Sequence, residues 1–318
     1  MKSDRPPQLD ADPMEHIDET SPLYDAIARF VYGCWGTPPG RFPGCQPVSI
    51  ERRHFKRLRA NPYVVCEKTD GERCMLAALS VNGIPMCVLI DRSMRMRQVS
   101  INLGRRAYEG TILEGELYEN TLLLYDGLII DGSPVGHLGF IDRYDALEKF
   151  IKTCIRMKSD AYRLVLKKFF ILEDFREFME HHLPTVEQEV DGIILTPVDE
   201  PVRTGTHETM FKWKPRDKNT VDFRMEKDGD TWRLYVQERG KPVFESFIPP
   251  GRIVDEPDWF EDGAIVECEY ITEETPMWWR PLKRRTDKTH PNNRRTYYRT
   301  IVNIKEDIKI EEFKDVAL

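Results

Sequence analysis

Apolar residues recur in short stretches between residues 63 and 131, a pattern typical of β-strands. Turn signals separate these stretches, which include "CMLAAL" and "TLLLY". From residue 142 to 182 the apolar spacing becomes that of amphipathic helices. An earlier helix is predicted over residues 21–35, with Ser21 and Pro22 at its start. This part of the chain is therefore expected to combine antiparallel sheets with flanking helices.

A second group of short strands follows Pro215. It comprises "TVDFRMEKDG", "TWRLYVQERG", "KPVFESFIP" and "AIVECEYI". Short strands at this spacing favour a small β-barrel. We therefore expect an α+β protein with a mobile N-terminal tail over residues 1–20, a first domain over 21–217 and a β-barrel domain with a C-terminal helix over 218–318.

The composition is that of an ordinary soluble globular protein: 318 residues, 40% hydrophobic, 32% charged and a net charge of -7. The basic residues are unevenly spread, and "WRPLKRRTDKTHPNNRR" forms a cationic block suited to phosphates. The seven cysteines include no C-x-x-C pair, which argues against structural zinc and a disulfide framework. No apolar run approaches the ~20 residues needed to cross a bilayer, so an intracellular protein without a membrane partner is expected.

The segment "EKTDGER", residues 67–73, separates two of the predicted strands. Asp70 and Gly71 are a turn signal, so Lys68 is expected at a strand end with Arg73 close to it. On these residues alone, the segment is typical of the solvent-exposed tip of a β-hairpin. Whether Lys68 has a chemical role therefore depends on motifs elsewhere in the chain.

Four further polar clusters stand where a predicted strand ends or a turn begins. They are "LEGEL" (113–117), "EVDGII" (189–194), "MFKWKP" (210–215) and "RRTDK" (284–288). Each alone has an ordinary structural explanation, because a carboxylate beside glycine is usually a turn and alternating lysines usually face water. Their order and spacing together are more specific than any one of them.

The ordered set resembles the covalent nucleotidyltransferase superfamily of mRNA capping guanylyltransferases and polynucleotide ligases. Three further segments are similar to signatures of the capping branch: "FPGCQPVSI" (42–50), "NTVDFRM" (219–225) and "WWRPLKRRTDKTHPNN" (278–293). Ligases share the lysine motif but generally lack this set. The resemblance implies an ATP-grasp-like nucleotidyltransferase domain of antiparallel sheets and helices, followed by an OB-fold lid domain.

The resemblance makes Lys68 the nucleophile that attacks the α-phosphorus of GTP, forms lysyl-GMP and releases pyrophosphate. An unperturbed lysine has a pKa of ~10.4, so only about one in a thousand is neutral near pH 7.5, a deficit of roughly 4 kcal/mol. Arg73, Lys212, Lys214 and a bound metal are the cations that could reduce this deficit. Arg73 is also expected to contact the sugar and phosphate side of the nucleotide.

Lys212 and Lys214 alternate along "KWK", so both are predicted to face one side of a strand and to reach the α-phosphate. Glu116 and Asp191 offer hard oxygen ligands suited to Mg²⁺ or Mn²⁺ and to ribose hydroxyls. Glu189 is a weaker metal candidate, which alternation places on the strand face of Asp191.

Other contacts follow from the resemblance alone. Tyr125 and Ile193 match positions that sandwich the guanine, with ordinary core packing as an equal alternative. Arg285, Asp287 and Lys288 would close over the β- and γ-phosphates as a mobile lid. The remaining expected nucleotide contacts are Glu67, Thr69, Asp70 and Arg92, and a surface salt bridge is the alternative for Arg92.

The leading hypothesis is an mRNA guanylyltransferase that transfers GMP to the 5′-diphosphate end of RNA and forms a GpppN cap. The alternatives are an ATP-dependent RNA or DNA ligase with the same lysine and an inactive RNA-binding scaffold. Expected partners are GTP, RNA, a divalent metal, separate RNA triphosphatase and cap methyltransferase chains and, as a further candidate, RNA polymerase. The expected compartment is the nucleus for a cellular enzyme and the host cytoplasm for a viral one.

Overall fold

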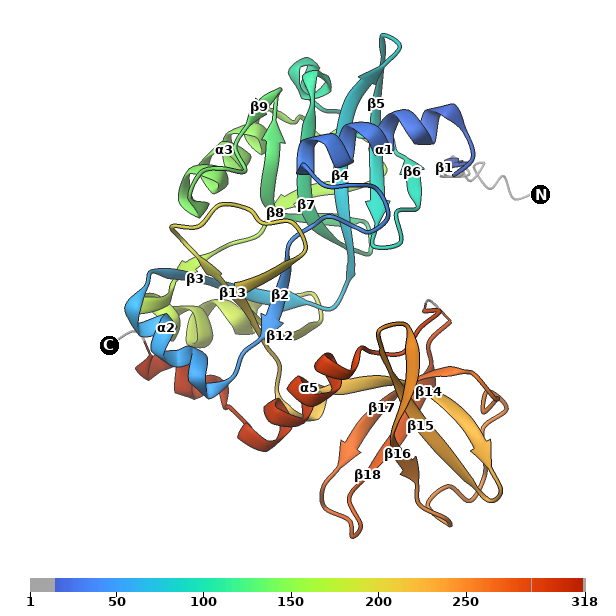
Figure 1. The fold of residues 1–318 in the computed structure, drawn as a ribbon. Coiled ribbons are helices and arrows are strands. Elements are labelled where there is room, and N and C mark those ends of the chain that lie inside the picture. The colour runs from blue at the N-terminus through green and yellow to red at the C-terminus, as the bar shows by residue number, and fades with distance from the viewer. Residues whose placement is uncertain (1–14, 287, 317–318) are drawn as a thin grey trace, which may run out of the picture.

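The computed structural model of the chain describes residues 15–286 and 288–316, and Figure 1 labels its elements. The strands are β1 (Glu15–Ile17), β2 (Gln46–Ser49), β3 (Tyr63–Thr69), β4 (Glu72–Val81), β5 (Ile84–Asp91), β6 (Met96–Gln98), β7 (Thr111–Tyr118), β8 (Thr121–Ile130), β9 (Ser133–Pro134), β10 (Arg163–Leu166), β11 (Phe170–Ile171), β12 (Val190–Pro197), β13 (Thr206–Trp213), β14 (Thr220–Asp228), β15 (Thr231–Glu238), β16 (Lys241–Ile248), β17 (Ile265–Ile271) and β18 (Trp278–Arg284). The α-helices are α1 (Pro22–Trp35), α2 (Phe55–Ala60), α3 (Phe140–Thr153), α4 (Phe175–Glu177) and α5 (Arg294–Glu306). Short helical turns are η1 (Arg52–His54), η2 (Arg105–Glu109), η3 (Leu172–Asp174), η4 (Phe178–His182), η5 (Leu183–Thr185), η6 (Arg216–Lys218) and η7 (Ile310–Asp315). None of these helices has the length and apolar character that crossing a membrane requires.

Three sheets organise the described residues into two lobes (Figure 1). The N-terminal lobe holds an eight-stranded sheet, β1-β6-β5-β4-β7-β8-β10 with β9 beside β8, and a five-stranded sheet, β11-β3-β12-β13-β2. The C-terminal lobe holds the antiparallel sheet β16-β15-β14-β17-β18, whose two edge strands contact each other. This arrangement confirms the predicted α+β class.

Strands β3 and β4 flank the predicted hairpin tip but belong to different sheets. β3 pairs with β12, whereas β4 pairs with β5 and β7. The hairpin interpretation is therefore wrong, because the turn at Asp70 and Gly71 carries the chain from one sheet to the other. Gly71 is needed for a close approach: a Cβ atom there would lie 2.7 Å from the carbonyl oxygen of Leu117. Lys68, at the end of β3, consequently lies where the two sheets meet.

The eight-stranded sheet is covered on both faces, which explains the uninterrupted apolar run in β4. Met75 packs in the core under α1, and the next residue, Leu76, packs in the core under α3. The helix predicted over residues 21–35 is confirmed as α1, and the Ser21 side chain caps it by accepting a hydrogen bond from the N–H of Tyr24. The second half of the predicted helical region is a series of short turns, η3 to η5, around α4.

After α5, the described part of the chain leaves the C-terminal lobe and packs against the core of the N-terminal lobe. Tyr297 and Ile304 of α5 pack in the C-terminal core, whereas Phe313 is fully buried in the core of the five-stranded sheet. The indole N–H of Trp213 donates to the carbonyl oxygen of Ile308 at 2.7 Å. Ile308, Phe313 and Val316, near the end of the predicted second domain, thus pack against the first lobe.

The predicted N-terminal tail is partly a regular element. Residues 1–14 lie outside the described range, but residues 15–17 form β1 and pair with β6 in antiparallel register. The prediction of a mobile segment is therefore wrong for these three residues. The short pairing adds an edge strand to the eight-stranded sheet.

Candidate active site

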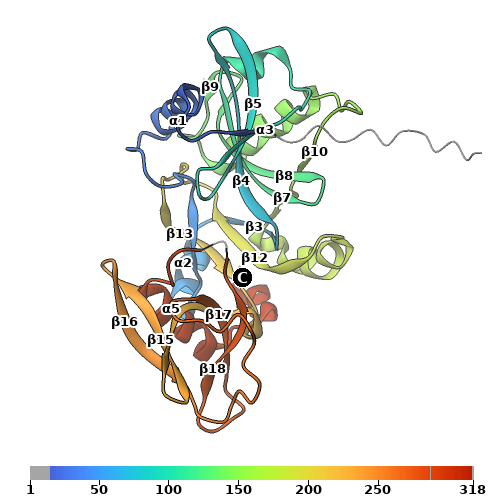
Figure 2. The same ribbon diagram turned by 90° about the vertical axis from the view of Figure 1, so that its right-hand side faces the viewer.

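A cleft of about 1480 Å³ lies between the two lobes, which Figure 2 shows one above the other. Its walls come from both sheets of the N-terminal lobe and from β14, β17 and β18. The predicted site residues that line it are Lys68, Thr69, Asp70, Arg73, Arg92, Glu116, Tyr125, Asp191, Lys212, Lys214, Arg285 and Lys288. Glu67 and Ile193 do not line it, and Asp287 lies outside the described residues.

Lys68 shares one carboxylate with a second lysine. Its Nζ atom is 2.8 Å from Oδ1 of Asp191, and the Nζ atom of Lys214 is 2.6 Å from Oδ2 of the same carboxylate. Burial raises the pKa of Asp191, but attraction to Lys68 and Lys214 outweighs burial, so the pKa lies below its ordinary value. Asp191 is therefore ionised and holds both amines at the cleft.

A β-bulge in β12 sets the direction of Asp191. Val190 pairs with Thr69, and Gly192 pairs with Lys68, which leaves Asp191 as the extra residue between them. An extra residue bends the strand and re-aims its side chain. The bulge thus brings the carboxylate of Asp191 onto the face that carries Lys68.

The same bulge changes which later residues of β12 face the cleft. Ile193 is fully buried in the core of the five-stranded sheet, and Ile194 lines the cleft in its place. The prediction that Ile193 sandwiches the guanine is therefore wrong. Glu189 is exposed outside the cleft lining, so the alternation that placed it beside Asp191 also fails.

Lys212 lies beside this group, and its Nζ atom makes no hydrogen bond or ion pair within the described part of the chain. As alternation predicts, it shares a cleft-facing side of the chain with Lys214, while the intervening Trp213 packs in the core. Burial, followed by repulsion from the neighbouring lysines, lowers the pKa of Lys212 from 10.5 to about 8. A bound anion would supply the missing partner.

Arg73 is held in a buried ion pair by Glu114, a residue that the motifs did not single out. Nη2 of Arg73 lies 2.6 Å from Oε1 of Glu114 and also donates to the carbonyl oxygen of Cys45. The guanidinium lies 5.3 Å from the ring centre of Phe42. Glu114 stands two residues before Glu116 on β7, and this alternation is the signal that could have identified it.

Glu67 faces away from the cleft because successive side chains of β3 alternate. Its carboxylate is buried and lies 3.3 Å from Nε2 of His182 and 3.5 Å from Nζ of Lys167. The predicted nucleotide contact by the Glu67 side chain is therefore wrong. Lys167 is buried, lines the cleft and also donates to the carbonyl oxygen of Glu67 at 2.7 Å. No motif marks Lys167 in the sequence.

Glu116 is a metal-ligand candidate that lines the cleft. Its Oε1 atom accepts a 3.3 Å hydrogen bond from the N–H of Gly71, and burial raises its pKa against the attraction of Lys68. The described residues contain no group of three or more His, Cys, Asp or Glu side chains that could hold a metal. Glu116 and Asp191 both line the cleft, and their carboxylate oxygens are of the type that Mg²⁺ and Mn²⁺ take as ligands beside water and phosphate oxygens.

Tyr125 enters the cleft from a second bulge. Glu114 pairs with Asp126, and Gly115 pairs with Leu124, so Tyr125 is the extra residue of β8. Burial raises the pKa of Tyr125 well above its ordinary value, so the phenol is neutral. The neutral ring offers a flat surface to a base at the cleft wall.

The lid cations Arg285 and Lys288 are held by a carboxylate of their own lobe. Nη1 of Arg285 lies 2.9 Å from Oδ1 of Asp222 and 3.5 Å from Oε2 of Glu267, and Nζ of Lys288 pairs with Oδ2 of Asp222. Asp222 belongs to "NTVDFRM", but it is not among the predicted site residues. Arg92 lines the cleft, is exposed, and has no ion-pair partner within residues 15–286 and 288–316.

Lys68, Lys212 and Lys214 in the N-terminal lobe, with Arg285 and Lys288 across the cleft, suit the phosphates of a nucleotide, and this fold and site are those of a nucleotidyltransferase. The family model described as mRNA capping enzyme, catalytic domain, matches residues 17–216. The model described as mRNA capping enzyme, C-terminal domain, matches residues 218–314. The chain belongs to the mRNA capping enzyme family.

Individual relatives agree with this assignment. The chain is 27% identical to the mRNA-capping enzyme subunit alpha of Schizosaccharomyces pombe, over 93% of this chain and 83% of the relative. It is 27% identical to the mRNA-capping enzyme of Mus musculus, over 86% of this chain but only 49% of that longer protein. Among solved structures, Pmar-Lig_PreS3 aligns with a TM-score of 0.43 at 13% identity, covering 81% of this chain and 70% of that one.

Proposed function

We propose that this protein is an mRNA guanylyltransferase that transfers GMP from GTP, through Lys68, to the 5′-diphosphate end of RNA. The observation that carries the proposal is the Lys68–Asp191–Lys214 group, with the unpartnered Lys212 beside it, in a member of the capping family.

In the first step the neutral Nζ atom of Lys68 attacks the α-phosphorus of GTP. A P–N bond forms, the bond to the bridging oxygen of pyrophosphate breaks, pyrophosphate leaves with the electron pair of that bond, and Nζ loses one proton to solvent. The hydrogen bond to Asp191 orients Nζ before attack. Lys212 and Lys214 balance the charge on the α-phosphate, which is the main requirement of phosphoryl transfer.

The lid cations act on the other end of the triphosphate. Arg285 and Lys288 are poised at the cleft by Asp222 and would hold the β- and γ-phosphates as pyrophosphate forms. Arg92, exposed on the opposite wall, is suited to phosphate or RNA. Mg²⁺ or Mn²⁺ would supply additional charge neutralisation at the phosphates, with Glu116 and Asp191 as its protein ligands.

In the second step the terminal phosphate of a 5′-diphosphate RNA attacks the phosphorus of lysyl-GMP. The P–N bond breaks, Lys68 recovers its amine, and a GpppN cap results. Separate triphosphatase and methyltransferase chains would make the diphosphate end and methylate the cap. The relatives named "subunit alpha" support a partner subunit. RNA polymerase is a further candidate partner, and the nucleus is the proposed compartment for a cellular enzyme.

The test is incubation of the protein with α-labelled GTP and Mg²⁺ or Mn²⁺. We expect a covalent label that resists alkali and is lost in acid, as a P–N bond requires. Lys68→Ala should abolish the label, and Lys68→Arg should do the same because a guanidinium stays protonated. Labelling by ATP instead of GTP would favour a ligase, and undiminished labelling of Lys68→Ala would refute the assignment of the nucleophile.

A further inference from the structure

Arg143 of α3 makes a two-pronged ion pair with Asp126 in the interior of the N-terminal lobe. Its Nε and Nη2 atoms donate to the two carboxylate oxygens of Asp126 at 2.8 and 2.9 Å. The Arg143 side chain is only 2% exposed. Burying two charges is costly unless their hydrogen bonds are all made, so a pair this deep calls for an explanation.

The remaining bonds of the pair explain how it is satisfied. Nη1 of Arg143 donates to the carbonyl oxygens of Leu138 and Glu200 at 2.7 and 2.9 Å, and Oδ1 of Asp126 also accepts from the N–H of Gly127 at 2.8 Å. Asp126 lines the cleft, but Arg143 and Gly127 already bind its carboxylate. The Asp126 carboxylate is therefore better suited to fix the position of β8 than to bind a substrate.

On one side the pair fixes the bulge that aims Tyr125 into the cleft. Asp126 directly follows Tyr125, and it pairs across the sheet with Glu114. Glu114 in turn holds Arg73 at 2.6 Å. The two buried carboxylates face each other, and each has its own arginine. Loss of Arg143 would leave Asp126 unpaired beside Glu114 and would push the bulge out of place.

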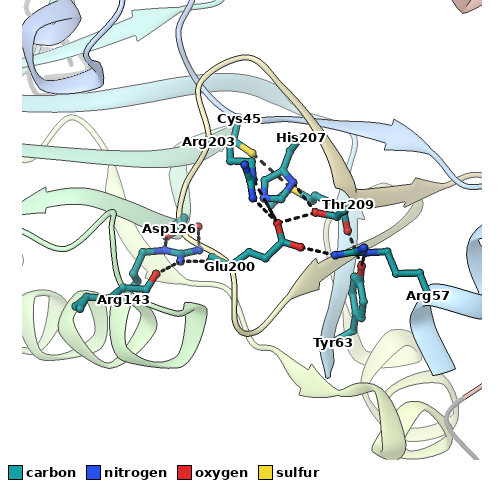
Figure 3. Close-up of polar contacts among 11 residues, drawn as sticks. Cys45, Arg57, Tyr63, Asp126, Arg143, Glu200, Arg203, His207 and Thr209 are labelled. Atoms are coloured by element: carbon teal, nitrogen blue, oxygen red, sulfur yellow. Dashed lines mark hydrogen bonds and ion pairs between the residues drawn. The ribbon is translucent and has the colours of Figure 1, made fainter. Parts of the chain in front are cut away.

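On the other side the pair clamps the loop of residues 198–205, between β12 and β13. Figure 3 shows the contacts that join Arg143 to Asp126 and to Glu200 of this loop. This loop runs on to Gly205, whose carbonyl oxygen accepts from the N–H of Gln46 at 2.7 Å. Cys45, which precedes Gln46 in the chain, supplies the carbonyl oxygen that accepts a hydrogen bond from Arg73.

We infer that Arg143 is a positioning residue that sets the affinity of the cleft for its nucleotide without touching it. Through Asp126 it orients Tyr125, and through the 198–205 loop it supports the carbonyl that holds Arg73. The inference rests on the proposed function, because it takes Tyr125 and Arg73 as the nucleotide's neighbours. A displacement of such groups costs about ten- to a hundredfold in binding or rate.

The test measures GTP binding by equilibrium dialysis in a Lys68→Met background, which cannot form the P–N bond. Arg143→Met combined with Asp126→Asn removes both charges and leaves no unpaired ion in the interior. We expect this combination to weaken GTP binding about ten- to a hundredfold. With Lys68 intact, labelling at saturating GTP should keep its rate within about threefold, because the lysines and the lid are unchanged.

The matched control is Glu200→Gln. Its carboxylate bonds to Arg57, Arg203 and Thr209 on the far side of the same loop (Figure 3), while its carbonyl oxygen, which Arg143 uses, is kept. The control should lower thermal stability and leave GTP binding unchanged. The inference would be overturned if the control weakened GTP binding as much as the double variant, or if the double variant did not weaken it. The ion pair of Arg143 and Asp126 would then have only a structural role.

Binding and labelling separate this inference from the proposed function. Absence of GTP labelling in the native protein would refute the function, and the same dialysis with ATP would still test the role of Arg143. A native protein that binds neither nucleotide would overturn both. The single variant Arg143→Lys keeps the charge but not the two-pronged geometry, so its GTP affinity should fall between native and the double variant.

Discussion

Replacing Lys212 with Met should raise the free energy of unfolding and at the same time strongly reduce labelling by GTP. Lys212 is a partly buried cation with no partner in the described residues, and its pKa is lowered from 10.5 to about 8. That difference is about 2.5 pH units, and at about 1.36 kcal/mol per unit it corresponds to a penalty of about 3 kcal/mol for the charged form. Without nucleotide, the free energy of unfolding should therefore rise by up to about 3 kcal/mol at pH 7.

The sign of the pH dependence follows from the same two values. A lysine whose folded-state pKa lies below its unfolded-state value destabilises the fold while both states are protonated, below pH 8. Between pH 8 and 10.5 the folded state releases its proton first, so the penalty disappears as the pH rises. The advantage of Lys212→Met over the native protein should thus be largest near pH 7 and fall to about 1 kcal/mol or less at pH 10.

Urea unfolding of both proteins at several pH values measures this difference, because other groups that titrate are common to the two. Lys214→Met is the matched control: Lys214 is paired with Asp191 at 2.6 Å, so its loss should give no stabilisation. In the labelling assay Lys212→Met should lose at least ~100-fold, the scale of one preorganised charge partner. A variant less stable than the native protein at pH 7, or an advantage that grows with pH, would refute the reasoning.

Other site residues give three further predictions. Glu116→Ala and Asp191→Ala should each reduce GTP labelling by at least ~100-fold with an unchanged circular-dichroism spectrum, and an unfolded spectrum would make them structural residues. Arg285→Ala or Lys288→Ala should suppress formation of the labelled enzyme far more than transfer of GMP to RNA, followed as loss of label in one turnover. Equal slowing of the two steps would assign these cations to an RNA-binding surface. Asp222→Ala should reproduce the lid defect because it pairs with both cations, and normal labelling would show that they act without it.

The residues that the motifs place at strand ends could be predicted because strand ends are where sheets present side chains to a cleft. Lys68, Lys212 and Lys214 are of this kind, and simple alternation along "KWK" was enough for the last two. The connection between β3 and β4 could not be predicted in the same way. A turn signal between two apolar strands fits a hairpin as well as a crossing between sheets, and only the pairing of β4 with β7 separates the two cases.

Ion-pair partners that long-range strand pairing brings together could not be predicted from the sequence either. Glu114 reaches Arg73 through the pairing of β7 with β4, and Asp222 reaches Arg285 and Lys288 across the C-terminal sheet. The sequence around a carboxylate in an apolar strand does not identify the residue that will be its ion-pair partner. Lys167 is the clearest case, since it is a buried lysine whose bonds to Glu67 depend on a strand a hundred residues earlier.

The two bulges show why the errors concentrate at the site itself. Alternation assigns the faces of a strand correctly only while each residue has one partner, and Asp191 and Tyr125 are the two cleft residues among those without one. A single inserted residue moved Ile193 into the core and put Ile194 in its place at the cleft. In a regular strand the side chains of successive residues alternate, so one of any two neighbouring residues would point away from the cleft. At these irregular positions the strand loses a ladder pair, and a carboxylate and an aromatic ring face the cleft instead.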